Sequence, residues 1–108
     1  MSKVPNYLTA QAADLRATKR NLERLYTMEE DAMMSGTRPA QETASLSSLR
    51  GTSERLYVNV LIRYLRDSHQ MTSFQASDLQ RFFTRQRMNG IGPVNKAYLL
   101  GLFPRELA

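Results

Sequence analysis

"TAQAADLRATKRNLERLYTMEEDAMMS", residues 9–35, decides the fold class of this chain. The stretch contains no Gly and no Pro, the two residues that most strongly oppose a helix. Apolar side chains recur along it at the three- and four-residue spacing that places them on one side of a helix. The pattern therefore predicts a long helix over 8–35 that buries a single stripe. These apolar residues are Leu8, Ala12, Leu15, Leu22, Leu25, Tyr26, Ala32 and Met33.

Outward from this stretch, the rest of the chain also has helical periods separated by short breaks rich in Gly, Pro, Ser and Thr. In the second segment Gly51 interrupts the pattern, so one long helix or two shorter ones would fit. Thr72 followed by Gln75 matches a capping box at the start of the third segment. The predicted helices are 39–69, possibly broken near 51, then 72–89, and a short one over 93–103.

These segments predict one all-α domain over residues 1–108. We expect the first two helices to form a long antiparallel helical hairpin, because a short linker joins them and each has a single apolar stripe. The last two would form a C-terminal helix-turn-helix packed across one end of the hairpin. The expected core includes Leu15, Leu22, Leu56, Val60, Phe82 and Leu99.

The charge of the chain points to a polyanionic partner. Its net charge is +5, its pI is about 10.0, and twelve of its fifteen basic residues are Arg. The planar guanidinium suits phosphates and carboxylates, whereas Lys offers only a point charge. The acids include the run 29–31, which we expect to form a solvated acidic bend.

The stretch "GIGP", residues 90–93, lies between the third and fourth predicted helices. It resembles the core of the helix-hairpin-helix, and the resemblance implies that amides near Gly90 and Gly92 bind a phosphate. Lys96 stands where that family has a small residue. The longer stretch 78–100 is also similar to the DNA-reading helix-turn-helix, although its turn is about two residues shorter. A simple Gly–Pro turn between two helices is the third interpretation.

We predict a small accessory protein, architectural or regulatory, that binds nucleic acid without catalysing a reaction. No aromatic residue interleaves with the Arg clusters in the predicted helices, so duplex DNA is favoured over single strands. The expected nucleic-acid contacts are Arg81, Arg85, Arg87, Gly90, Gly92 and Lys96, together with Arg63, Arg66, Arg16, Lys19 and Arg20.

Other functions find less support in the sequence. His69 is the only His, Cys is absent, and no motif predicts a catalytic pair, a metal site or a cofactor. No segment reads as a signal peptide or membrane span, so we expect a cytoplasmic protein. The alternative function is a helical adaptor whose basic surface binds an acidic protein, with Met28, Met33 and Met34 near one contact. We also expect a homodimer, because the apolar stripes exceed what one hairpin can cover.

Overall fold

The computed structural model describes the backbone of residues 6–35, 40–89 and 96–108, and the side chains of residues 8–34, 45–84 and 96–108. Within these ranges the chain is helical and contains no strand, which confirms the predicted all-α class. None of these helices is long and apolar enough to cross a membrane. The elements are α1 (Asn6–Ser35), α2 (Ala40–Ser68), α3 (Ser73–Asn89), α4 (Lys96–Gly101) and the 3-10 helix η1 (Arg105–Leu107).

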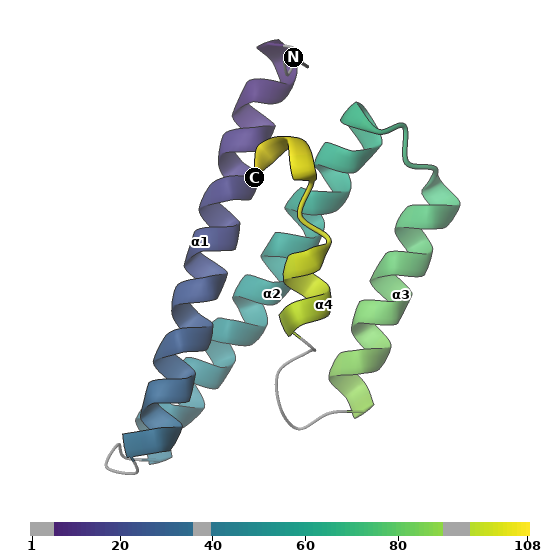
Figure 1. The fold of residues 1–108 in the computed structure, drawn as a ribbon. Helices are drawn as coiled ribbons and strands as arrows, with labels where there is room; N and C mark the ends of the chain where they lie inside the picture. Colours follow the sequence, from purple (N-terminus) through teal and green to yellow (C-terminus); the bar gives the residue numbers. More distant parts are fainter. Residues whose placement is uncertain (1–5, 36–39, 90–95) are drawn as a thin grey trace.

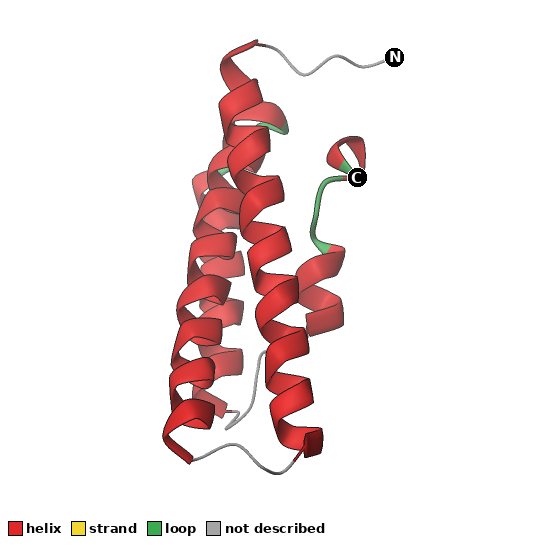
Figure 2. Cartoon of the chain, turned by 90° about the vertical axis from the view of Figure 1, so that its left-hand side faces the viewer, coloured by secondary structure: helices red, strands yellow, loops and turns green. Residues whose placement is uncertain are grey.

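The long helices lie side by side and alternate in direction (Figure 1). Helix α1 runs antiparallel to α2, and α3 returns beside α2. The prediction placed the C-terminal segment across one end of the helical hairpin. Instead, α4 and η1 lie along the side of the long helices, and they stand apart to the right of them in the turned view of Figure 2.

One buried cluster draws side chains from all five elements, so α4 and η1 help to close the core. The predicted core positions Leu15, Leu22 and Leu99 are buried, and Val60 is partly buried against the cluster. The prediction was wrong for Leu56 and Phe82, whose exposed fractions are 50% and 39%. The cluster contains Leu8, Ala12, Leu15, Leu22, Tyr26, Tyr57, Val58, Leu61, Ile62, Tyr64, Ala76, Phe83, Leu99 and Leu107.

The misplaced positions follow from a small error in helix rotation. In α2 the buried side runs through Tyr57, Leu61 and Tyr64, so its neighbour Leu56 points outward. In α3 the buried position is Phe83, and the adjacent Phe82 turns toward solvent. Successive residues of a helix are about 100° apart, so a shift of one position exchanges a buried side chain for an exposed one.

Helix α2 continues through Gly51, which settles the alternative in favour of one long helix. A helical Gly costs about 1 kcal/mol relative to Ala. Gly51 is buried in the described structure, so the packing of the two long helices compensates for this cost.

The turn between α2 and α3 confirms the predicted capping box. Thr72 Oγ1 accepts a hydrogen bond from the backbone N–H of Gln75 at 3.1 Å, and Gln75 Oε1 accepts one from the N–H of Thr72 at 2.9 Å. Just before it, Gln70 has φ of 51°, and the N–H of Met71 donates to the carbonyl of Leu65 at 3.1 Å. The left-handed residue ends α2, and the capping box begins α3.

Candidate nucleic-acid interface

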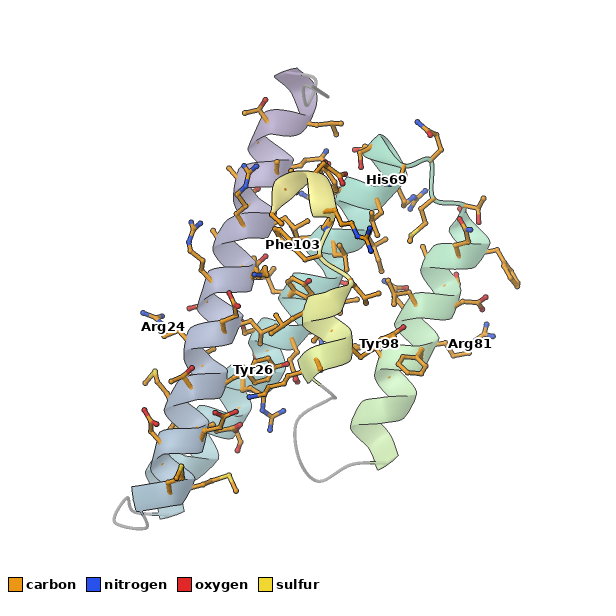
Figure 3. All side chains as sticks on the ribbon, viewed as in Figure 1. Arg24, Tyr26, His69, Arg81, Tyr98 and Phe103 are labelled. Atoms are coloured by element: carbon orange, nitrogen blue, oxygen red, sulfur yellow. The ribbon has the colours of Figure 1, made fainter. Side chains whose placement is uncertain are left out.

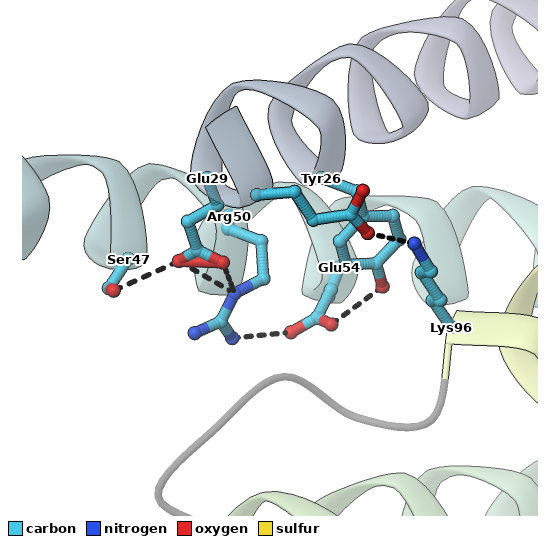
Figure 4. A network of polar contacts seen from close by, with 7 residues as sticks. Tyr26, Glu29, Ser47, Arg50, Glu54 and Lys96 are labelled. Atoms are coloured by element: carbon cyan, nitrogen blue, oxygen red, sulfur yellow. Dashed lines mark hydrogen bonds and ion pairs between the residues drawn. The ribbon is translucent and has the colours of Figure 1, made fainter. Parts of the chain in front are cut away.

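Two acidic residues of the long helices are buried around one Arg (Figure 4). Arg50 Nε lies 3.0 Å from Glu29 Oε2, and its Nη1 lies 3.2 Å from Glu54 Oε1. Tyr26 donates a hydrogen bond to Glu54 Oε2 at 2.7 Å, and Ser47 donates one to Glu29 Oε1 at 2.9 Å. The network therefore joins α1 to α2 through polar groups that, apart from the partly exposed Ser47, are buried.

The geometry of this network shifts the pKa of Arg50 and of Tyr26. Burial disfavours the charged form of Arg50, but the hydrogen bond to Glu29 and the charge of Glu54 outweigh burial and raise its pKa. Burial, followed by the hydrogen bond to Glu54, raises the pKa of Tyr26 and keeps this phenol a donor. The result is one guanidinium held between two carboxylates.

The predicted acidic bend is therefore not solvated throughout. Glu29 is 8% exposed and belongs to the Arg50 network. Glu30 forms an ion pair with Lys96 of α4, and Lys96 Nζ also lies 6.0 Å from the centroid of the Tyr26 ring. Lys96 was predicted to bind phosphate. In this fold its charge meets a carboxylate and ties α4 to α1.

Two more predicted contacts hold the C-terminal segment. Arg16 donates from Nε to the carbonyl of Leu107 at 3.2 Å. Lys19 pairs with Glu23 at 3.4 Å and lies 4.9 Å from the centroid of the Phe103 ring. Both side chains therefore contribute to packing as well as to surface charge.

His69 also contacts the C-terminal segment. His69 Nε2 lies 2.5 Å from Glu106 Oε1, and Tyr64 donates to the same oxygen at 3.1 Å. The hydrogen bond with His69 is the main cause that lowers the pKa of Glu106. Burial, followed by the hydrogen bond to Glu106, raises the pKa of Tyr64. This cluster fixes η1 against the end of α2.

Only some of the contact residues predicted in the C-terminal part of the chain have described side chains. Arg81 is exposed on α3, and its Nη1 lies 3.8 Å from Asp78 Oδ1. Gly90 and Gly92 of the "GIGP" turn lie outside the described residues, as do the side chains of Arg85 and Arg87.

The outward side of α2 carries a row of basic residues with little acidic compensation. Arg55, Asn59, Arg63 and Arg66 are all exposed, and they occupy about 80° of the helix circumference at 3.6 residues per turn. Asn59, Arg63 and Arg66 line a shallow surface hollow together with Asp67. Arg63 and Arg66 were predicted as contacts. We call Arg55, Asn59, Arg63 and Arg66 the α2 ridge.

Sequence reasoning missed Arg55 and, on α1, Arg24. Arg55, Asn59 and Arg63 are spaced by four residues, so reading the polar period of α2 would have found the ridge. Arg24 follows the predicted Arg20 by four residues and is also exposed. It extends away from the bundle in Figure 3 and donates to Asn21 Oδ1 at 2.8 Å.

The described side chains offer no group of His, Asp and Glu that could hold a metal ion. Comparisons of the chain with family models, with curated proteins and with solved structures found no match.

Proposed function

We propose that this chain is a small accessory protein, architectural or regulatory and without catalytic activity, that binds the phosphate backbone of duplex DNA. The α2 ridge would supply the central contact. Arg20 and Arg24 on α1 and Arg81 on α3 would add exposed positive charge at other positions. A contribution from the "GIGP" turn stays a prediction.

One observation carries this proposal: the α2 ridge exposes three arginines, whereas several acids of the chain are paired within the fold. Glu29 and Glu54 bind the buried Arg50, and Glu106 binds His69. On the α2 ridge the three arginines face solvent. Asp67, which accepts a hydrogen bond from Gln11 at 2.8 Å, is the one acidic residue among the described residues that line the hollow beside them. The excess positive charge of the chain is thus available to a polyanion.

The dimensions of the ridge suit a nucleic-acid backbone. Arg55 and Arg66 are eleven residues apart, which is about 16 Å along a helix. Duplex DNA carries one phosphate charge per about 1.7 Å of its axis, so three arginines over this length can each reach a different phosphate. The two tyrosines of α2, Tyr57 and Tyr64, are buried and cannot stack on bases. The ridge therefore favours backbone contacts without sequence preference.

The experiment is a salt-dependent titration of two unrelated DNA duplexes by fluorescence anisotropy. Replacing Arg55, Arg63 and Arg66 together by Ala should weaken binding to both duplexes alike. It should also lower the log–log salt slope by about 3, because about 0.9 counterion is released for each phosphate contact.

A matched control removes the same charge from residues that bond within the fold. The variant Arg16→Ala/Lys19→Ala/Lys96→Ala lowers the net charge equally, so it should bind more tightly than the ridge variant once circular dichroism shows that both are folded. Equal weakening by the two variants would mean that net charge alone drives binding. A wild-type protein that binds neither duplex at low salt would eliminate the proposal.

One observation favours a second candidate, a helical adaptor for an acidic protein. Leu49 and Leu56 are 56% and 50% exposed and lie on the outward side of α2, near Arg55 and Arg63. A mixed apolar and basic helix face suits an acidic amphipathic helix. Replacing both leucines by Ser should leave DNA binding unchanged if DNA is the partner. A protein partner would lose affinity for this variant.

A further inference from the structure

Helix α3 carries two exposed aromatic residues that belong neither to the core nor to the α2 ridge. Phe74 is 73% exposed and Phe82 is 39% exposed. The Phe82 ring contacts that of Tyr98 on α4, with centroids 4.9 Å apart and an interplanar angle of 49°. Single exposed apolar residues are normal, but a group of them on one helix side indicates an interaction surface.

The two aromatic residues of α3 lie at equal spacing on either side of Asp78, so the order Phe–Asp–Phe is the same in both directions of the helix. Phe74, Asp78 and Phe82 are spaced by four residues, so they share one side of α3, and Arg81 lies beside them. Figure 3 shows Arg81 pointing away from the bundle and Tyr98 beside α3. We call Phe74, Asp78, Arg81 and Phe82 the α3 row.

We propose that the α3 row binds the α3 row of a second copy of this chain, with the two helices antiparallel. A two-fold axis at Asp78 places Phe74 of each copy opposite Phe82 of the other. Each aromatic lies about 6 Å along the helix from Asp78, on opposite sides of it. The contact is thus made twice, as an isologous interface requires. This inference does not depend on nucleic-acid binding.

Charge complementarity favours a second copy as the occupant. Asp78 and Arg81 side chains are 49% and 67% exposed, and the shortest distance between their charged atoms within one copy is 3.8 Å. In the antiparallel pair, Arg81 lies only about 4.5 Å along the axis from Asp78 of the other copy. Both carboxylates at the axis are then close to both guanidinium groups.

The same centre offers a phosphate no net attraction, because Asp78 offsets the charge of Arg81. The surface also differs from the α2 ridge, with which it shares no residue. Dimerisation through α3 would therefore leave both α2 ridges available, although it would cover Arg81 and remove it from contact with DNA.

Sedimentation equilibrium of the full chain across the micromolar range tests the proposal. We expect a monomer–dimer equilibrium for the wild type. Arg81→Asp would bring four carboxylates together at the axis and should raise the dimer dissociation constant by at least about tenfold. Phe74→Ser should weaken the dimer in the same direction. Both positions are exposed, so circular dichroism should show unchanged helicity.

The charge-exchanged variant Asp78→Arg/Arg81→Asp is the matched control. It restores opposite charges both within each α3 and across the axis, so its dissociation constant should return to within about threefold of the wild type. A monomeric wild type at every concentration overturns the proposal and leaves the row for another protein. An unchanged dissociation constant for Arg81→Asp, or a charge-exchanged variant as weak as Arg81→Asp, shows that dimers form elsewhere.

Discussion

Replacing Arg50 by Met should destabilise this protein more than almost any other single change. Met has a similar length, so it fills most of the space of the arginine stem without supplying a charge. The carboxylates of Glu29 and Glu54, which contact the guanidinium, would stay in place. The exposed fraction is 8% for Glu29 and 0% for Glu54. Arg50→Met thus leaves two negative charges together in a site removed from water.

The expected cost follows from that imbalance. Removing one partner of a buried ion pair costs about 3–5 kcal/mol, and here one residue serves two partners. Domains of this size have a free energy of unfolding of about 5–15 kcal/mol, so the loss is a large part of the total. Urea denaturation followed by circular dichroism measures it directly. In thermal melts, each kcal/mol corresponds to about 4–8 °C for a domain of this size.

A triple variant separates the charge effect from the loss of side-chain volume. Glu29→Met/Arg50→Met/Glu54→Leu replaces the three charged groups by apolar ones. Stability should recover to within about 1–3 kcal/mol of the wild type, the remaining loss coming from the Tyr26 hydroxyl, which loses its acceptor Glu54. An Arg50→Met variant that loses less than about 1 kcal/mol would refute the reasoning, because exposed ion pairs have effects of that size. A triple variant as unstable as Arg50→Met would show that packing, not charge, is the cause.

Two further predictions concern the buried phenol groups and the C-terminal segment. Tyr57 is 0% exposed and its hydroxyl has no hydrogen-bond partner in the described structure, so Tyr57→Phe should be neutral or stabilising. Tyr26→Phe should instead cost about 1–3 kcal/mol, because it removes the hydrogen bond to Glu54. Urea denaturation of both variants checks this, and a larger loss for Tyr57→Phe would contradict it. Because the contact with His69 lowers the pKa of Glu106, this contact stabilises the folded protein at pH values above the ordinary carboxyl pKa of about 4.3. The stabilisation is lost as the pH falls from that value through the lowered pKa of Glu106. Glu106→Gln should therefore flatten the acid side of the stability profile in thermal melts, and an identical profile would exclude this role.

Local patterns predicted the helices well because a helix is built from contacts between residues close in sequence. The period of the first segment, the capping box at Thr72 and the alternative of one continuous second helix all depend on such contacts. The errors at Leu56 and Phe82 arose where two adjacent apolar residues competed for one buried position. A stripe alone does not determine which neighbour turns inward.

The polar partners could not be read from the sequence, because they join distant segments. Glu29 and Arg50 are 21 residues apart, and Glu30 and Lys96 are 66 apart. From composition, the acids at 29–31 and the predicted contact Lys96 were both assigned to the surface. Only the packing of α4 along α1 shows that Lys96 meets a carboxylate.

These internal pairings make the surface more basic than the composition suggests. The Arg50 network holds two carboxylates and one guanidinium, so the rest of the chain carries one more positive charge than the net value of +5. Buried charges stabilise the fold through packing and hydrogen bonds, whereas exposed charges set the electrostatic potential at the surface where a partner binds. Folding and the proposed DNA contact therefore depend on different arginines: Arg50 joins α1 to α2, while Arg55, Arg63 and Arg66 face outward from the same helix. Because one helix carries both, an antiparallel contact made through α3 would fix the spacing of two α2 ridges without altering either of them.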